Sequence, residues 1–474
     1  MASESSELVV IGAGPGGYAA AFLAADLGME TVLVDPEPNP GGVCLYRGCI
    51  PSKALLHAAA VIAQAKEAER WGIAFSGPSI DVERLRAWKD SVVEKLTGGL
   101  GVLRKRRKIE YLRGRARFRD AGTVEIEPVS GQGSTLSFRH AILATGSGPS
   151  ALGNLPVEHE RFMNSERALD LRDVPERLLV VGAGYIGLEM SSVYGALGSR
   201  ITVVEMTDGI LPGVDRDLVR PLGTRLKGAL EAILLGTVVA EWSETDHGVR
   251  VRFEGKQAPS EPMEFDRILV SVGRKPCSGG LGLENTRVQL TQGGFVRVNG
   301  QRQSDEPSIY AVGDVAGQPM LAHKASHEGR TAVQAISGRR VMFDPRAIPA
   351  VVFTEPEIAW CGLTEVQAKR EGREIKVSRF PWSASGRAAT LDHTDGVTKL
   401  VLEPGTDRVL GVGLAGTGAG ELIAEGVLAV EMGACAEDLS LSIHPHPTLS
   451  ETVMEAAEAL YGLSTHYHRP AAKG

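Results

Sequence analysis

LVVIGAGPGGYAAAFLAADLGMETVLVD, residues 8–35, aligns without a gap with LLVVGAGYIGLEMSSVYGALGSRITVVE, residues 178–205. In each copy an apolar strand leads into a G-x-G-x-x-G turn, a helix with small residues on one face, and a second apolar strand that ends in an acid. The spacing from the first glycine to the acid, Gly12 to Asp35 and Gly182 to Glu205, is the same in both copies. An internal repeat of β-α-β units therefore organises the chain and predicts an α/β fold.

The glycines of each turn have a physical purpose. They permit the tight turn, let the backbone approach a pyrophosphate, and bring the helix against the strand, while the helix N-terminus offers free N–H groups. A single such motif is equally typical of a glycine-rich turn without a ligand, but two copies with matching flanks predict two dinucleotide sites. The turn glycines are Gly12, Gly14 and Gly17 in the first copy and Gly182, Gly184 and Gly187 in the second.

The acids at the strand ends are placed to accept hydrogen bonds from ribose hydroxyls. Glu205 would repel a 2′-phosphate, and the following residues 206–210 contain no arginine that could receive one. The second site is therefore predicted to prefer NAD over NADP.

Composition limits the possible classes. The 474 residues can form about three domains at roughly 150 residues each. The N-terminus lacks a secretory signal and no segment is long and apolar enough to span a membrane, so we expect a soluble cytoplasmic protein without a membrane partner. A net charge of −7 argues against nucleic acid as a partner, and the basic run 104–108 is interpreted as a solvated helix face.

Two of the five cysteines lie close together in GGVCLYRGCIPSKALLH, residues 41–57. Cysteines are normally kept reduced in an intracellular protein, so the pair Cys44 and Cys49 is expected to be catalytic or metal-binding rather than a structural staple.

Two further strand endings and one histidine stand out. The segments AILATGS (141–147) and IYAVGDVAG (310–318) each end an apolar strand, and a helix is expected to begin near Leu321. Asp314 could bind a polyol chain or orient a pyrophosphate, but it could equally be a helix cap or turn acid. In SIHPHPTLSE, His446 precedes Glu451 by five residues at the opening of a predicted helix (450–460), an arrangement suited to a base and the group that orients it. His57, His323 and His327 are interpreted as structural, whereas His444 could line the same channel as His446.

Taken together, C-x-x-x-x-C-x-P-S-K, the two dinucleotide motifs, ATGS, IYAVGD and HPTLSE resemble the flavoprotein disulfide reductase family (class I pyridine nucleotide-disulfide oxidoreductases) from residue 7 to about residue 460. The resemblance implies an α/β fold with two Rossmann-like dinucleotide-binding domains, for FAD and NAD, and a C-terminal α+β dimerisation domain. The expected FAD-binding domain is discontinuous (1–150 and 275–346), the NAD-binding domain spans 151–274, and the interface domain spans 347–474. The family's homodimer, with active sites shared between subunits, is expected.

The resemblance also implies residue roles. Cys44 and Cys49 form a redox-active disulfide, in which Cys44 exchanges with substrate and Cys49 contacts the flavin, and Gly41, Gly42 and Gly48 would permit the irregular helix start that the bridge requires. His446 is the base and Glu451 its partner, and Lys53 pairs with Glu189 beside the flavin. The implied FAD-binding residues are Gly12, Gly14, Gly17, Asp35, Lys53, Gly146, Asp314 and Ala322. The implied NAD-binding residues are Gly182, Gly184, Gly187, Glu205 and Gly273. Tyr185 stands where some relatives keep an aromatic gate, although a packing role is about as probable.

A zinc site at the cysteine pair is disfavoured, because Cys277, Cys361 and Cys435 are solitary and are interpreted as small core residues. No metal is expected.

The activity implied is oxidation of protein-bound dihydrolipoyl groups with NAD⁺, with the lipoyl domain of a 2-oxo acid dehydrogenase complex or a glycine cleavage system as partner. Glutathione reductase is disfavoured by the missing arginines, and mercuric reductase by a tail without a cysteine pair. A non-catalytic flavin-binding protein would not need both cysteines with His446 and Glu451. Asp35, Tyr46-Arg47 and SASGRA (383–388) depart from the commonest family pattern, and Tyr46-Arg47 is expected on the substrate side.

Overall fold

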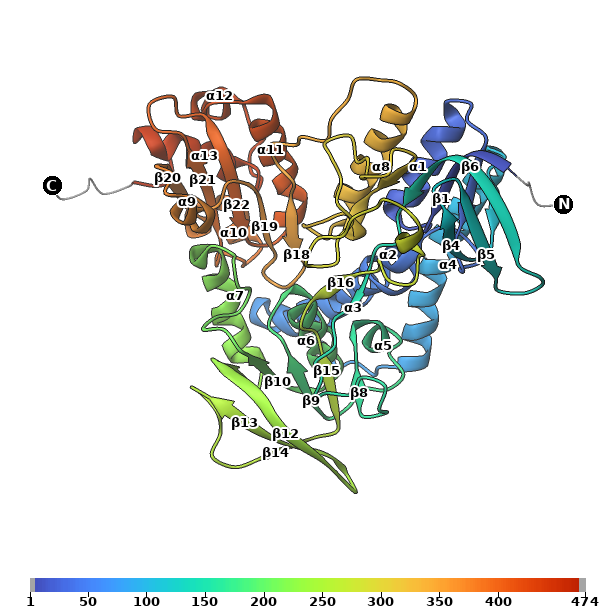
Figure 1. Cartoon of the computed structure of the whole chain (residues 1–474). Coiled ribbons are helices and arrows are strands. Elements are labelled where there is room, and N and C mark those ends of the chain that lie inside the picture. The colour runs from blue at the N-terminus through green and yellow to red at the C-terminus, as the bar shows by residue number, and fades with distance from the viewer. Residues whose placement is uncertain (1–4, 469–474) are drawn as a thin grey trace.

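The computed structural model describes residues 5–468 of the chain (Figure 1). Its first sheet has seven strands in the order β3-β2-β1-β6-β5-β4, with β17 paired to β6. Strands β1, β2, β3, β6 and β17 run parallel, and β4 and β5 form an antiparallel extension. The strand bounds are β1 Ser5–Ile11, β2 Thr31–Val34, β3 Glu110–Leu112, β4 Gly114–Asp120, β5 Thr123–Pro128, β6 Ser134–Leu143 and β17 Ile309–Ala311.

The second sheet contains five parallel strands in the order β11-β10-β9-β15-β8. An antiparallel sheet of three strands, β12-β13-β14, accompanies it. The bounds are β8 Phe162–Met163, β9 Arg177–Val181, β10 Arg200–Glu205, β11 Ala232–Leu235, β12 Thr237–Thr245, β13 Gly248–Gly255, β14 Met263–Phe265 and β15 Arg267–Val270, with helices α5 Ser165–Leu169, α6 Tyr185–Leu197 and α7 Arg216–Ala229.

The two sheets repeat the same unit at their centres. The unit β1-α1-β2, with α1 at Pro15–Asp26, corresponds to β9-α6-β10. A side chain at Gly17 would place its Cβ 1.8 Å from the Gly12 carbonyl oxygen, and one at Gly187 would place it 2.1 Å from the Gly182 oxygen. No other residue fits at either position, so the close approach of helix and strand that the glycines predict is present twice.

The third sheet is antiparallel and belongs to the C-terminal part of the chain, in the order β18-β19-β22-β21-β20. Helices α11 and α13 pack on it around the fully buried Trp382. The bounds are β18 Ala350–Val352, β19 Ile358–Gly362, β20 Lys376–Pro381, β21 Val397–Leu402 and β22 Val409–Ala415, with α9 Glu365–Glu371, α10 Gly386–Thr390, α11 Ala419–Met432, α12 Ala436–Leu441 and α13 Glu451–Tyr461. The predicted mixture of parallel α/β and C-terminal α+β architecture is confirmed.

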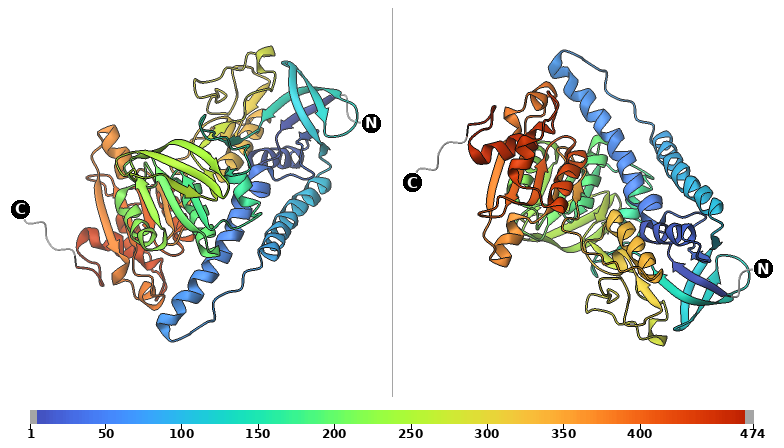
Figure 2. Two further views of the ribbon diagram at one scale, coloured as in Figure 1. Left: turned by 90° about the horizontal axis from the view of Figure 1, so that it is seen from below. Right: turned by 90° about the horizontal axis from the view of Figure 1, so that it is seen from above.

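A long helical hairpin joins these parts (Figure 2). Helix α3 (Cys49–Glu67) packs against α6 and is followed, after the short turn η1 (Ala68–Trp71), by α4 (Val82–Arg106). Leu55 on α3 belongs to the same apolar core as Leu188 on α6 and Val352 on β18. The helix that begins at Cys49 therefore contacts all three parts of the molecule. The basic run 104–108 ends α4, where Arg104 stacks on Tyr111 and Arg107 pairs with Asp26, so only part of it is free solvated surface.

Two crossings connect the first and second sheets. They lie at β7 (Ser147–Pro149) and β16 (Arg274–Pro276), which pair antiparallel. After the second crossing the chain returns to the first sheet through β17, the turn η3 (Gly313–Val315) and α8 (Ala322–Ile336). We therefore propose the domain division 1–150 with 275–346, 151–274 and 347–474, whose outer ends, 1–4 and 469–474, lie outside the described residues.

The interpretation of the three solitary cysteines was right for one of them. Cys361 is buried in the C-terminal core, whereas Cys277 is exposed and Cys435 is half-buried at the N-cap of α12. Cys277 directly follows Pro276 at the second crossing, where the backbone faces a cavity rather than a core. Along residues 5–468, no helix combines the length and apolar character needed to cross a bilayer.

A buried cation joins the second and third parts. The ammonium of Lys399, only 1% exposed, lies 2.5 Å from Asp215, 2.8 Å from Asp217 and 2.9 Å from Glu365. Asp215 also accepts the N–H groups of Glu365 and Val366 at the start of α9. Within the described residues these three acids are the one group close enough to hold a metal ion, and Lys399 fills the space between them.

Replacing Lys399 by methionine should strongly destabilise the fold, because three acidic groups would lose the buried cation that compensates them. We expect a loss of roughly 3–5 kcal/mol in the free energy of unfolding, measured by urea denaturation. Lys376→Met is the matched control, since the Lys376–Asp407 pair is half-exposed and its loss should cost about 0–1 kcal/mol. Equal effects of the two substitutions would contradict a structural role for the Lys399 cluster.

Candidate functional site

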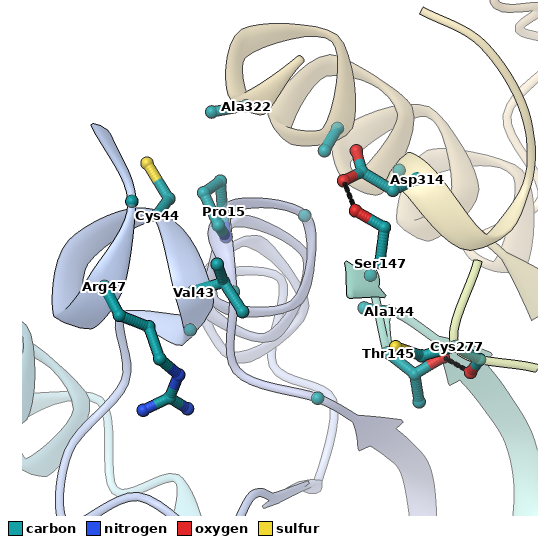
Figure 3. Close-up of a pocket in the computed structure, with 18 of the residues that line it drawn as sticks. Pro15, Val43, Cys44, Arg47, Ala144, Thr145, Ser147, Cys277, Asp314 and Ala322 are labelled. Carbon is teal, nitrogen blue, oxygen red and sulfur yellow. Dashed lines mark hydrogen bonds between the residues drawn. The ribbon is translucent and has the colours of Figure 1, made fainter. Parts of the chain in front are cut away.

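A cavity lies at the carboxyl ends of the first sheet, where open α/β sheets bind their ligands. Its volume is about 440 Å³, within the range of small-molecule sites. Its walls come from the turn after β1, from α2 (Gly42–Arg47) and the start of α3, from the ends of β6 and β17, and from the start of α8 (Figure 3). Most of the residues assigned by resemblance to FAD line this one cavity: Gly12, Gly14, Asp35, Lys53, Gly146, Asp314 and Ala322.

The two acids that end the repeats are held alike. Asp35 accepts the N–H of Ala13 at 2.7 Å, and Glu205 accepts the N–H of Ala183 at 2.8 Å. The second oxygen of each carboxylate accepts the N–H two residues farther on, at 2.9 Å and 2.8 Å. Burial raises the pKa of Asp35, and the two N–H donors oppose this. Both oxygens of Asp35 keep a further lone pair, whereas Oε1 of Glu205 also accepts the Thr207 hydroxyl at 2.8 Å and only Oε2 keeps one, so each acid can still accept a ribose hydroxyl.

The cysteine pair spans a break between two helices. Helix α2 ends at Arg47 and α3 begins at Cys49, with the irregular Gly48 (φ −143°, ψ −117°) between them. A Cβ at Gly48 would lie 2.8 Å from the Val43 carbonyl oxygen, which explains the need for glycine. The expected irregular helix start is thus present, and it brings the two sulfur atoms together at the cavity wall.

The two cysteines are not bridged in the structure, and their thiols interact through a hydrogen bond. The hydrogen bond from Cys44 lowers the pKa of Cys49 to about 7, and the Lys53 ammonium acts in the same direction against burial. The same hydrogen bond, together with burial, raises the pKa of Cys44. Cys49 is therefore the thiolate of the pair, and thiolates are the reactive form of cysteine.

Lys53 and Glu189, predicted to pair, are brought together. The Lys53 ammonium lies 2.9 Å and 3.1 Å from the two carboxylate oxygens of Glu189, which is 3% exposed. Glu189 also accepts the N–H of Phe353 at 3.1 Å, and the Lys53 ammonium lies 4.4 Å from the centre of the Phe353 ring. The Lys53–Glu189 ion pair thus joins α3 to α6 beside the cavity, and the contacts of both side chains with Phe353 connect this pair to the end of β18.

Asp314 points into the cavity from the turn after β17 (Figure 3). It accepts a hydrogen bond of 2.5 Å from Ser147, which in turn accepts one of 2.7 Å from Arg274. The turn acid that sequence alone left ambiguous is therefore a cavity residue, and α8 begins at Ala322 on the same wall. The sequence alone did not identify Ser147 or Arg274 as cavity residues, although Ser147 directly follows Gly146 and Arg274 directly follows Gly273, both of which were predicted to bind a dinucleotide.

The second dinucleotide motif lies on the other side of this wall. Tyr185, exposed and placed on the cavity, begins α6 directly after Gly184. Gly182 and Gly273 both have a positive φ, of 102° and 111°, at the carboxyl ends of β9 and β15. Among residues 206–210, which contain no arginine, Met206 and Asp208 are exposed, and the Asp208 carboxylate lies 3.5 Å from the Lys256 ammonium.

His446 and Glu451 form the predicted dyad away from the cavity. The two side chains meet at 2.8 Å between Nδ1 and the carboxylate, and His446 is 67% exposed. Burial acts to raise the pKa of Glu451, but hydrogen bonds from the Thr448 N–H and from His446 hold it below its usual value. Within one chain, the dyad does not line the cavity that contains the cysteines.

The other histidines occupy distinct settings. Nε2 of His444 forms a hydrogen bond of 2.8 Å with the Glu425 carboxylate, so the partner of this imidazole is Glu425 and not His446. His323 contacts the Pro349 carbonyl oxygen, and burial lowers its pKa. His57 packs near Trp88, which agrees with a structural role.

Tyr46 and Arg47 end α2, between the two cysteines. Tyr46 donates to the Asn39 carbonyl oxygen, and Arg47 points away from Cys44 toward the interior of the cavity (Figure 3). Its guanidinium lies 2.5 Å from Glu37 and 3.5 Å from Glu166 on α5. Two carboxylates therefore hold the Arg47 side chain, and the expectation that this pair faces the substrate stays a prediction.

Comparison with known proteins gives two family matches. Residues 6–329 match the pyridine nucleotide-disulphide oxidoreductases, and residues 348–457 match the dimerisation domain of the same group. The chain is 46% identical to the dihydrolipoyl dehydrogenase of Vibrio cholerae over 468 residues, which cover 99% of this chain and 98% of the relative. It is 45% identical to the dihydrolipoyl dehydrogenase of Thermus scotoductus over 462 residues, covering 97% and 98%.

Solved structures give the same picture. LpdA of Mycobacterium tuberculosis superposes with a TM-score of 0.88 at 26% identity, covering 96% of this chain and 99% of that one. The Cu(II) complex of RclA, an HOCl-induced flavoprotein disulfide reductase of Escherichia coli, superposes with a TM-score of 0.86 at 25% identity, with the same coverage.

The titration of Cys49 provides a test of the pair's geometry. In the reduced protein, the rate of Cys49 alkylation by iodoacetamide should rise with pH around a midpoint of about 7, because only the thiolate reacts. Cys44→Ala removes the hydrogen bond that stabilises this thiolate, so the midpoint should move up toward about 8.5. Mass spectrometry of the Cys49 peptide measures both, with Cys361 as the internal control, since burial raises its pKa to about 12. An unchanged midpoint in Cys44→Ala would overturn the assignment.

Proposed function

Because the chain belongs to the pyridine nucleotide-disulphide oxidoreductase family, we propose that it acts as a dihydrolipoyl dehydrogenase, oxidising dihydrolipoyl groups with NAD⁺. It is an enzyme, an oxidoreductase that uses FAD and NAD. The observation that carries the proposal is the Cys44–Cys49 pair at the cavity wall beside Lys53, in a chain whose full-length relatives at about 45% identity are dihydrolipoyl dehydrogenases.

The cavity fits FAD. A Cβ at Gly42 would lie 2.5 Å from the Cα of Gly14, another residue of the cavity wall, and Gly146 has a positive φ of 71° with open space where a Cβ would be. We propose that Gly12 and Gly14 hold the pyrophosphate, with Gly17 keeping α1 close to the strand, that Asp35 holds the ribose and Gly146, Asp314 and Ala322 the remainder, and that Lys53 lies beside the ring. When bound, FAD supplies a two-electron carrier between the cysteine pair and NAD⁺.

The protein's own groups perform the sulfur chemistry. In the oxidised pair, a substrate thiolate attacks the sulfur of Cys44, the Cys44–Cys49 bond breaks, and Cys49 leaves as a thiolate. The second substrate thiolate then attacks the substrate sulfur of the mixed disulfide, which closes the substrate disulfide and releases Cys44. The substrate loses two electrons and the pair gains them. The low pKa of Cys49 makes it a good leaving group, and the Lys53 ammonium stabilises its charge.

Glu189 supports this chemistry through two contacts. Its ion pair keeps the Lys53 ammonium beside the cavity, and its bond to the Phe353 N–H fixes both side chains against the C-terminal domain. Tyr185 stands between the cavity and the second dinucleotide motif, where it can cover or open the nicotinamide position.

The proton from the substrate dithiol needs an acceptor. His446 is suited to this task, because Glu451 orients its imidazole and stabilises the charged form. Its exposure, its distance from the cavity of its own chain and the dimerisation domain that carries it support a homodimer in which His446 of the partner subunit completes each site.

The nucleotide, the partner and the location complete the proposal. Glu205, Asp208 and the absence of an arginine at the described second motif favour NAD over NADP, with Gly182, Gly184, Gly187 and Gly273 along the dinucleotide. The macromolecular partner is the lipoyl domain of a 2-oxo acid dehydrogenase complex or a glycine cleavage system. A cytoplasmic location belongs to the same proposal.

The direct test is the oxidation of dihydrolipoamide by the purified yellow protein. NAD⁺ should support this reaction well and NADP⁺ poorly, Cys49→Ser should abolish it, and His446→Gln should lower kcat by roughly 10²- to 10⁴-fold. Cys435→Ser is the control, since the residue caps α12 outside the cavity and should keep the full rate. A flavin-bearing protein that leaves dihydrolipoamide unchanged and reduces no disulfide would favour a non-catalytic flavin protein.

The shared site can be tested by mixing subunits. Neither Cys49→Ser nor His446→Gln should be active alone, but a hybrid dimer contains one site with both intact groups. Random exchange of subunits should therefore restore about a quarter of the wild-type rate, because half of the dimers are hybrids with one active site each. If both groups served the same chain, the mixture would stay inactive, and the monomer would be the functional unit.

A further inference from the structure

Three charged side chains, two buried and one half-buried, lie beneath the turn that carries Asp314 into the cavity. They are Arg302, in the segment before β17, and Lys324 and Glu328, one helical turn apart on α8. Glu328 is 0% exposed and Lys324 is 5% exposed. None of the three lines the cavity, so their role must be exerted through the backbone and the field around the turn.

The contacts of Glu328 join both cations to the backbone. One carboxylate oxygen accepts the N–H of Gly313 at 2.6 Å and the Lys324 ammonium at 3.2 Å. The other accepts the Arg302 guanidinium at 2.8 Å. Lys324 also donates to the carbonyl oxygens of Gly313 and Gly317, at 3.3 Å and 2.9 Å.

These bonds determine the conformation of the turn. Both polar backbone groups of Gly313 are bound by the triad, and Gly313 adopts a left-handed conformation with φ of 74°. A Cβ at this position would lie 2.9 Å from Ala325 on α8, so the turn and the helix are in close contact. Asp314 follows directly, and its direction into the cavity depends on the Gly313 backbone.

The charges of the triad do not cancel. Two cations and one carboxylate leave one positive charge at the turn, because Lys324 and Glu328 are buried and balance each other while Arg302, whose side chain is 16% exposed, adds the second cation. The excess charge has the same sign as the helix dipole at the N-terminus of α8, which begins at Ala322 on the cavity wall. Both therefore favour a negative group inside the cavity.

We propose that the Arg302–Glu328–Lys324 triad positions and charges the flavin site: it holds Asp314 and the start of α8 in place, and its excess positive charge stabilises the anionic groups of FAD. This inference rests on the proposed binding of FAD to the cavity. The three residues are positioning residues, since they touch neither the cavity nor the cysteines.

The experiment uses Lys324→Met in the full-length protein purified with its flavin. The substitution removes the excess charge and the bonds to Gly313 and Gly317, but leaves the Arg302–Glu328 pair intact. The dissociation constant of FAD, followed by the fluorescence of the released flavin, should rise roughly 10- to 100-fold. The reduction potential of the bound flavin should become more negative, because the reduced, more anionic form loses a stabilising positive charge.

Two further variants separate positioning from mere stability. Lys399→Met removes an equally buried lysine from a cluster away from the cavity, so it should lower the unfolding temperature while leaving the flavin affinity and potential as in wild type. Arg302→Met removes the second cation at the more exposed edge of the triad and should shift the potential in the same direction as Lys324→Met. It serves as the test if Lys324→Met does not fold.

The outcomes are distinct. If Lys324→Met or Arg302→Met loses stability but keeps the wild-type flavin affinity and potential, the triad is only a structural cluster and the inference is wrong. If the wild-type protein itself binds no FAD, the proposed function fails first. A raised FAD dissociation constant together with a more negative potential, absent from Lys399→Met, supports the triad as part of the flavin site.

Discussion

The ion pair between Lys53 and Glu189 is the contact on which the arrangement of the molecule depends. It joins the helix that begins at Cys49 to the first helix of the second dinucleotide fold, and Glu189 extends the link to the C-terminal domain through the Phe353 N–H. A buried carboxylate is stable only when its lone pairs are filled, and here the partners come from two other domains. The domains therefore cannot shift relative to one another without exposing an uncompensated charge beside the reactive sulfur.

The same principle recurs at the other domain contacts. Lys399 lies between acids of the second and third domains, and Glu67 at the end of α3 pairs with Arg225 and faces His393. Apolar packing continues across the boundaries, as Leu55 shows, but it has no direction. Hydrogen bonds between charged groups are directional, because each requires a particular distance and angle. The apolar core thus supplies the cohesion, and the ion pairs specify where α3, and with it Cys49, stands.

Sequence alone predicted what depends on local pattern. The two glycine turns, the terminal acids and the irregular start at Gly48 are encoded within short segments, and the structure shows each of them. What it could not predict arises from contacts between distant segments. Arg302 and Glu328 are 26 residues apart in the sequence, and β17 lies between them, so their ion pair is not visible in a local pattern. Likewise, the residues around Cys277 do not indicate that this cysteine lies at a cavity. The contact of Arg47 with Glu166 on α5 could not be predicted for the same reason, since the two residues lie far apart in the sequence.

The separation of the dyad from the cysteines follows from these constraints. The two cysteines lie at the glycine-containing junction of α2 and α3, beside the first sheet. Glu451 is the first residue of α13, which packs on the third sheet, and His446 lies just before this helix. The ion pairs that fix the domains leave His446 exposed, so one chain holds the cysteine pair and the cavity but not the proposed proton acceptor beside them. On the proposed function, assembly of two chains would supply that acceptor and cover the sulfur at once. A monomer would then hold a low-pKa thiol open to solvent, and its redox chemistry would be incomplete until it dimerised.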